Sequence, residues 1–228
     1  MTTTLPCVEL EPRDGAVEAA VIWLHGLGAS GHDFEPLVPL LNVPRTRFVF
    51  PHAPSRPVTI NGGMSMPAWY DILSLEPTST RESESDVEES AALIRALLER
   101  ERERGVPAER TVLAGFSQGG ALALHVGIQE AETLAGIMVL SAYALQDRKV
   151  AKRWVDAQRE TPFMFAHGRR DEMVPSKRGR RAYELIQTLH GAPDRVRWHD
   201  YPMGHEVCIE ELQAVGGWLR EVLRVESP

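Results

Sequence analysis

Hydrophobic and polar positions follow one another along this chain in blocks that predict strands and helices in turn. Short runs are apolar throughout, as in Val21-Ile22-Trp23-Leu24, which is typical of a parallel sheet covered on both faces. The strands predicted in this way are residues 19–24, 47–50, 111–114, 136–140, 162–166 and 196–199. Helical patterns fill the intervening stretches at 30–41, 85–104, 118–129, 175–190 and 206–224. This alternation predicts an α/β fold with a mainly parallel central sheet and helices on both faces.

The predicted helix at 85–104 shows how the pattern separates core from surface. Val87, Ala91, Ile94 and Leu98 recur at the spacing of one buried helical stripe. Its end, residues 99–104, alternates acidic and basic side chains, as a solvated helix face commonly does. We therefore do not expect a partner-binding arm there.

One long connection, residues 55–75, resists assignment to a strand or a helix. It contains prolines and glycines, but it also carries the apolar Met64, Met66, Trp69 and Leu73. Long loops in compact domains are usually functional or disordered, and an apolar loop is a poor candidate for disorder. Two interpretations remain open: a satellite of the core, or a wall of a substrate pocket.

Composition narrows the classes of function. The 228 residues suffice for one domain, 1–228, and the net charge of −7 argues against a general nucleic-acid binder. The polar start of the chain predicts no secretory signal, and no apolar stretch approaches the length of a membrane span. Cys7 and Cys208 lie in neither a metal-binding nor a redox spacing. We expect a cytoplasmic protein without stable membrane insertion.

The chemistry begins at Gly115-Phe116-Ser117-Gln118-Gly119-Gly120, between a predicted strand and a predicted helix. A Gly-x-Ser-x-Gly sequence in that setting is typical of a tight turn that exposes the serine hydroxyl as a nucleophile. The glycines leave space for backbone to pass close by. Ser117 is therefore the predicted nucleophile.

A serine nucleophile needs a histidine base and a carboxylate that orients the base. The carboxylate should follow a strand at the carboxyl edge of the sheet, where Asp171 comes after the strand at 162–166. Glu172 and Asp147 are alternatives to Asp171. His205, in the turn after the last strand, is the predicted base. The other downstream histidines are His167, His190 and His199.

The reaction also needs two donors for a developing oxyanion. One is the backbone N–H of Gln118 at a helix N-terminus, and the other should come from the loop after an early strand. That loop is His25-Gly26-Leu27-Gly28-Ala29-Ser30-Gly31, where Leu27 is the predicted donor. A catalytic role for His25 is the alternative to a role in bracing this loop, and we expect the bracing role because the triad already has its base. Because no His-Glu-x-x-His spacing is present and the cysteines are isolated, we expect no metal and no cofactor.

Taken together, these stretches resemble the phospholipase/carboxylesterase family of small α/β-hydrolases, which includes acyl-protein thioesterases and bacterial carboxylesterases. The shared stretches are Leu24-His25-Gly26-Leu27-Gly28, Met66-Pro67-Ala68-Trp69-Tyr70-Asp71, the motif around Ser117, His167-Gly168 with Asp171 and Val174-Pro175, and Gly204-His205. The resemblance implies an α/β-hydrolase fold without a separate cap domain, and sometimes a homodimer. It also implies that the loop at 55–75 borders the acyl site. One departure is Ala29, where the family commonly has an aspartate.

The expected function is that of a serine carboxylesterase acting through an acyl-enzyme on a small ester or acyl substrate. Within the same class, an acyl-protein thioesterase or a lysophospholipase is the alternative. From another class, a catalytically silent binding module on the same scaffold is disfavoured, because every position of the predicted triad is intact. An interaction protein is a third class, but no feature of the sequence beyond its composition supports it.

Overall fold

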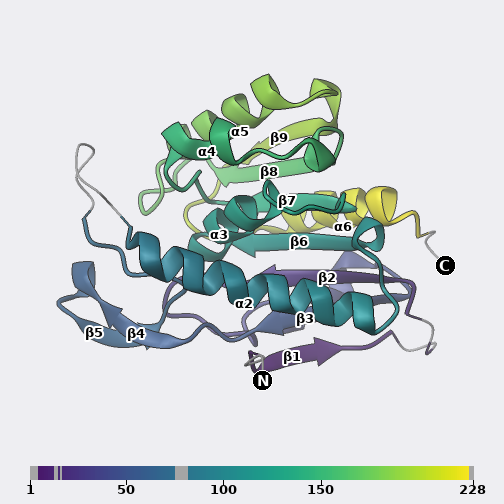
Figure 1. The fold of residues 1–228 in the computed structure, drawn as a ribbon, viewed down its shortest axis with the longest axis horizontal. Helices are drawn as coiled ribbons and strands as arrows, with labels where there is room; N and C mark the ends of the chain where they lie inside the picture. The colour runs from purple at the N-terminus through teal and green to yellow at the C-terminus, as the bar shows by residue number, and fades with distance from the viewer. Residues whose placement is uncertain (1–4, 13–14, 16, 75–81, 226–228) are drawn as a thin grey trace.

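The computed structural model describes residues 5–12, 15, 17–74 and 82–225 and is built around a seven-stranded sheet (Figure 1). The strand order is β1-β3-β2-β6-β7-β8-β9. Its strands are β1 (Cys7–Leu10), β2 (Ala19–Leu24), β3 (Thr46–Pro51), β6 (Thr111–Phe116), β7 (Gly136–Leu140), β8 (Phe163–Gly168) and β9 (Val196–Tyr201). All neighbours pair in parallel except β1, which runs antiparallel to β3. The mainly parallel sheet is thus confirmed.

Helices cover both faces of the sheet. The principal ones are α2 (Glu84–Glu103), α3 (Gln118–Gly127), α5 (Ser176–Leu189) and α6 (Ile209–Leu223), with short helices α1 (Val38–Leu41) and α4 (Val150–Arg153). Buried residues of α2, α3 and α5 share one core cluster, and those of α1 and α6 share another. Because strand side chains alternate between faces, Ile22 of β2 belongs to the first cluster and Trp23 to the second.

The sequence pattern locates most of these elements within a few residues, and three regions differ. The predicted helix at 30–41 is a 3₁₀ turn at Glu35–Leu37 followed by the short α1, because Pro36 and Pro39 interrupt the ladder. Strand β1 is an additional edge strand. The connection at 55–75 contains a hairpin, β4 (Ser55–Val58) and β5 (Met64–Pro67). Leu75 lies outside the described residues.

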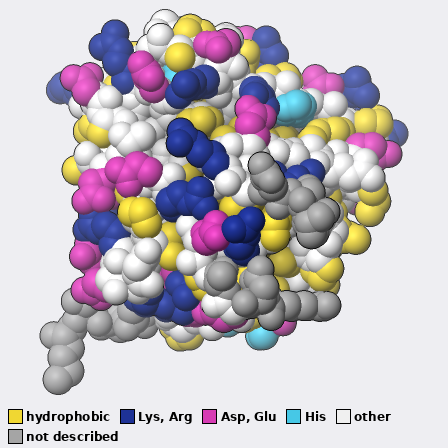
Figure 2. Space-filling model, turned by 90° about the vertical axis from the view of Figure 1, so that its right-hand side faces the viewer, with side chains coloured by type: hydrophobic (Ala, Val, Ile, Leu, Met, Phe, Trp, Pro, Cys, Tyr) yellow, Lys and Arg dark blue, Asp and Glu magenta, His cyan; other side chains and the backbone are white. Residues whose placement is uncertain are grey.

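The parallel strands place their carboxyl ends at one edge of the sheet, on the same side as the β4–β5 hairpin (Figure 1). At the opposite edge, acidic and basic side chains lie beside one another on the surface (Figure 2). An example is Arg45, whose guanidinium lies 2.7 Å from a carboxylate oxygen of Glu18. Within the described part of the chain, no helix combines the length and the apolar character that crossing a bilayer requires. A single domain over 1–228 stays a prediction.

Candidate active site

Ser117 lies on a sharp turn between β6 and α3, at the carboxyl edge of the sheet. Its backbone has φ 54° and ψ −120°, a conformation that L-residues rarely adopt. The turn packs closely against the end of β2, and only a glycine fits at position 119. A Cβ there would lie 2.5 Å from the carbonyl oxygens of both Leu24 and His25. The Ser117 N–H donates to the Leu140 carbonyl at 2.9 Å, which fastens the turn to β7. The hydroxyl thereby faces a cavity.

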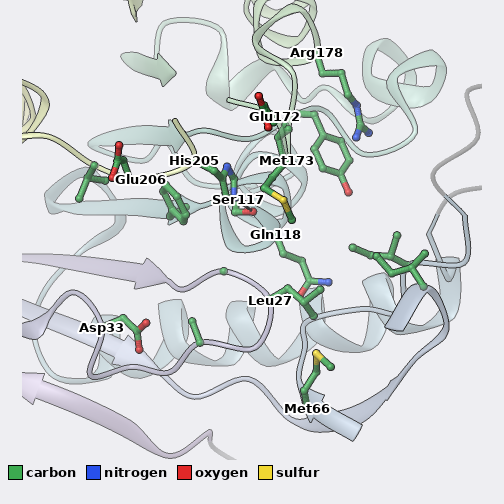
Figure 3. A pocket seen from close by; sticks show the side chains of 18 of the residues that line it. Leu27, Asp33, Met66, Ser117, Gln118, Glu172, Met173, Arg178, His205 and Glu206 are labelled. Atoms are coloured by element: carbon green, nitrogen blue, oxygen red, sulfur yellow. Dashed lines mark hydrogen bonds between the residues drawn. The ribbon is translucent and has the colours of Figure 1, made fainter. Parts of the chain in front are cut away.

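The structure brings the three predicted side chains together, and Figure 3 shows two of them, His205 and Ser117, beside each other at the cavity. The Nε2 atom of His205 lies 2.9 Å from the Ser117 Oγ, and its Nδ1 atom lies 2.7 Å from Oδ2 of Asp171. An ionised carboxylate can only accept, so the proton of a neutral imidazole belongs on Nδ1 and leaves Nε2 free to accept the serine proton. The Phe116 ring packs against the imidazole, with the ring centroids 4.9 Å apart.

Asp171 is held firmly in the turn after β8. Its Oδ1 accepts hydrogen bonds from the backbone N–H groups of Met173 and Val174, at 3.0 and 2.8 Å. The buried imidazole of His167 lies against the same turn, with its Nε2 atom 2.7 Å from the Val174 carbonyl and 3.4 Å from Oδ2 of Asp171. Burial lowers the pKa of His167, which favours a neutral ring here.

The alternative acids and bases lie in other environments. Asp147 pairs with Arg181 at 2.8 Å. Glu172 lies on the cavity wall, and no described histidine forms a hydrogen bond or an ion pair with it. The His190 Nε2 atom lies 2.7 Å from the Thr161 carbonyl, and His199 is part of β9. Among the described histidines, His205 is the one that bonds to Ser117.

The two predicted oxyanion donors also line the cavity (Figure 3). Gln118 is the first residue of α3, so its N–H has no acceptor within the helix. Neither this N–H nor that of Leu27 donates to another described residue. The loop that carries Leu27 is braced by His25, whose Nε2 accepts from the Ala53 N–H at 3.0 Å while Nδ1 donates to the Gly26 carbonyl at 2.7 Å. Burial lowers the pKa of His25, consistent with this neutral tautomer.

The cavity has a volume of about 640 Å³ and is largely apolar. Of the residues predicted for substrate binding, Met66 lines it, whereas Met64, Trp69 and Leu73 do not. Met64 and Met66 share a strand face, but Met64 lies next to the hairpin turn and is 65% exposed. Leu73 is exposed, and Trp69 is buried behind the wall.

Other side chains complete the wall, and the sequence pattern did not single them out. They come from segments far apart in the chain: Phe34, Leu37, Ile60, Ile72, Tyr143, Met173, Arg178 and Val207. Ile60 and Ile72 lie in the connection at 55–75, whose apolar character was the available signal. For the others, only the folded chain brings them to the cavity.

Comparison with known proteins places this chain in a family. Residues 5–223 match the family model described as phospholipase/carboxylesterase. The chain belongs to this family. Its members are serine hydrolases, and this chain is accordingly a carboxylic ester hydrolase with an α/β-hydrolase fold.

Similar sequences and structures agree with this assignment. The chain is 38% identical to acyl-protein thioesterase 1 of Neurospora crassa, over 94% of this chain and 91% of that protein. It is similar in structure to SOBER1 of Arabidopsis thaliana, with a TM-score of 0.81 and 29% identity over 91% of this chain and all of the other. Acyl-protein thioesterase 2 of Zea mays gives a TM-score of 0.81 at 26% identity, over 96% of this chain and 99% of that one.

Proposed function

We propose that this hydrolase uses Ser117, His205 and Asp171 as a catalytic triad. The observation that carries the proposal is the 2.9 Å separation between the His205 Nε2 and the Ser117 Oγ, at the wall of an apolar cavity. His205 takes the hydroxyl proton as the Ser117 oxygen attacks the acyl carbonyl. Asp171 stabilises the imidazolium that forms.

The N–H groups of Leu27 and Gln118 donate to the tetrahedral oxyanion, aided by the N-terminal end of α3. When the intermediate collapses, the bond to the leaving group breaks and His205 returns its proton to that group. Water then attacks the acyl-enzyme, with His205 again removing the proton. The acid leaves and the Ser117 hydroxyl is restored.

We propose carboxylic esters as the substrate class, with an acyl chain lying along the apolar wall that includes Met66 and Ile72. A thioester differs only in its leaving group, so the same groups can serve it. The relatives named acyl-protein thioesterase 1 in Neurospora crassa and in Gibberella zeae, at 38% and 37% identity, favour an acyl-protein thioesterase as the second candidate.

The test is the substitution Ser117→Ala with Ser85→Ala as its control, since Ser85 is an exposed serine on the first turn of α2. We expect Ser117→Ala to lose turnover of p-nitrophenyl butyrate to a residual trace and to lose labelling by a fluorophosphonate probe, whereas Ser85→Ala keeps both. Substantial turnover by a folded Ser117→Ala protein would overturn the proposal.

The substrate class is tested on one preparation with three substrates of equal acyl length. These are a p-nitrophenyl ester, an S-acylated cysteine peptide and a lysophosphatidylcholine. For each substrate, kcat/KM is divided by the rate constant of its uncatalysed hydrolysis. A carboxylesterase should give the highest ratio on the p-nitrophenyl ester, whereas the highest ratio on the S-acylated peptide would select the thioesterase. A cytoplasmic location belongs to the same proposal, and a homodimer stays a prediction from the family resemblance.

A further inference from the structure

Residues 68–70 form a buried segment directly after β5. Together with Pro67, the last residue of β5, they bond to the Gln118 side chain and to the loop residues before and after Leu27. Ala68, Trp69 and Tyr70 are fully buried, although the preceding hairpin is largely exposed. None of these three residues lines the cavity. Their polar groups instead make hydrogen bonds to two separate parts of the site.

The first set of bonds holds the loop that carries Leu27. The Pro67 carbonyl accepts from the Gly28 N–H at 2.8 Å, immediately after Leu27 in the chain. The indole N–H of Trp69 donates to the His25 carbonyl at 2.8 Å, two residues before Leu27. The loop is therefore fixed on both sides of Leu27, the predicted donor, which lines the cavity.

The second set holds Gln118 through its side chain. The Gln118 Oε1 accepts from the Trp69 N–H at 2.8 Å, and its Nε2 donates to the Tyr70 carbonyl at 2.7 Å. Both ends of the buried amide are thereby occupied by the same segment. Gln118, one of the two predicted donors, is thus bonded to the same segment that holds the loop of Leu27, the other predicted donor.

The segment is itself anchored to the rest of the fold. The Ser90 hydroxyl, on α2, donates to the Trp69 carbonyl. The hydroxyls of Tyr70 and Tyr143 share a hydrogen bond of 3.1 Å. Gly119 also packs directly against the His25 carbonyl. That close contact limits how near α3 and the loop approach, whereas the directional hydrogen bonds control how the two N–H groups are oriented.

We propose that Trp69 and the side chain of Gln118 are positioning residues that set the separation and direction of the Leu27 and Gln118 N–H groups. This inference rests on the proposed oxyanion hole. Donors of that kind act only when they lie about 2.7–3.1 Å from the oxyanion, and a misplacement of about 1 Å can cost about 100-fold in rate. Four hydrogen bonds to one rigid segment provide the required constraint.

The test uses two variants. Trp69→Phe removes the indole N–H and keeps an aromatic ring, and Gln118→Met removes the side-chain amide, with its oxygen and its nitrogen, and keeps the backbone N–H. Rates are expressed per active site, counted by burst titration with a p-nitrophenyl ester. We expect kcat to fall about 10- to 100-fold in each variant, with KM changed less than about twofold.

A transition-state analogue separates positioning from packing. An alkyl trifluoromethyl ketone adds to Ser117 and forms a tetrahedral oxyanion, whereas the corresponding secondary alcohol binds without an adduct. Affinity for the ketone should weaken by the same factor as kcat/KM, and affinity for the alcohol should not change. Wild-type kcat per active site, or unchanged ketone affinity, in both variants would overturn the proposal.

Trp23→Phe is the matched control. Trp23 is also fully buried, but its indole N–H has no hydrogen-bond partner among the described residues. This variant should lose stability while retaining kcat per active site and ketone affinity. If the control Trp23→Phe loses as much kcat as Trp69→Phe and Gln118→Met do, the losses come from disturbed packing in general and the proposal fails. Substantial ester turnover by a folded Ser117→Ala protein would instead refute the proposed function, and that variant is measured separately.

Discussion

Glu211 is a fully buried carboxyl group on the first turn of α6, the helix that begins soon after His205. Neither of its carboxyl oxygens has a hydrogen-bond partner among the described residues. Burial raises its pKa from 4.5 to about 8, and the nearby backbone N–H of Cys208 only partly opposes this. The folded protein therefore keeps this group protonated at a pH where the unfolded chain ionises it.

The raised pKa predicts that stability declines with alkalinity. Between pH 4.5 and about 8 the unfolded state binds fewer protons than the folded state, so the free energy of unfolding falls as pH rises, by at most about 1.4 kcal/mol per pH unit. Glu211→Gln removes this dependence. Relative to wild type, its urea midpoint should rise between about pH 6 and about pH 9. The exposed Glu210→Gln should show no such change, and equal shifts in both variants would contradict the assignment.

At the residue scale, motif and chain order were sufficient to select the residues that we propose for catalysis. Ser117, Asp171 and His205 were predicted from chain order and from their position after strands, and His205 lies within hydrogen-bond distance of both of the others. The orientation of Met64 and Leu73 could not be predicted, because it depends on where the hairpin ends relative to the cavity. The burial of Glu211 depends on the packing of α6, which a charged residue in a polar helical turn does not reveal.

At the scale of elements, a buried ion pair joins β3 to α2. The Arg47 Nη1 atom lies 2.7 Å from Oε2 of Glu101, whose side chain is fully buried. Arg100 and Arg104 lie 3.2 and 3.0 Å from its other oxygen, and both also pair with Glu9 on β1. The helix end that the sequence pattern assigned to a solvated face therefore includes one buried carboxylate, which ties α2 to β3.

Breaking this pair should destabilise the protein without altering its chemistry. Glu101→Gln leaves Arg47 with less compensation for its buried charge, and losses of about 3–5 kcal/mol are typical when one partner of such a pair is removed. The C-terminal end of α2 lies away from the carboxyl edge of the sheet (Figure 1). Below its melting temperature the variant should retain wild-type kcat/KM per active site. The exposed Glu103→Gln should melt as wild type does; a Glu101→Gln protein of wild-type stability would refute the role.

The elements themselves were largely predictable where the hydrophobic pattern was continuous. Strands β2 and β7 match their predicted bounds because each is apolar throughout and buried on both faces. Strand β1 was missed because its side chains are only half-buried and its polar residues pair with α2. The β4–β5 hairpin was missed because its register depends on pairing rather than on a hydrophobic alternation.

For the whole molecule, the site is assembled from both the centre and the edge of one sheet. Ser117 follows β6, which has a strand on either side, and Asp171 follows β8. His205 follows β9, an edge strand that, among the described strands, pairs with β8 alone. The turn before His205 packs closely on β8, since a Cβ on Gly168 would lie 2.6 Å from the Met203 carbonyl.

An edge strand separates from a sheet at a lower free-energy cost than the core requires to unfold. Departure of β9 would carry His205, the proposed general base, away from Ser117, the proposed nucleophile, while Ser117 is still in place. In increasing urea, esterase activity should therefore disappear before the far-UV circular dichroism signal does, and it should return on dilution. Coincident transitions would show that the edge is as secure as the centre. Inactivation that precedes denaturation would mean that the working life of this enzyme is limited by its last strand rather than by its core.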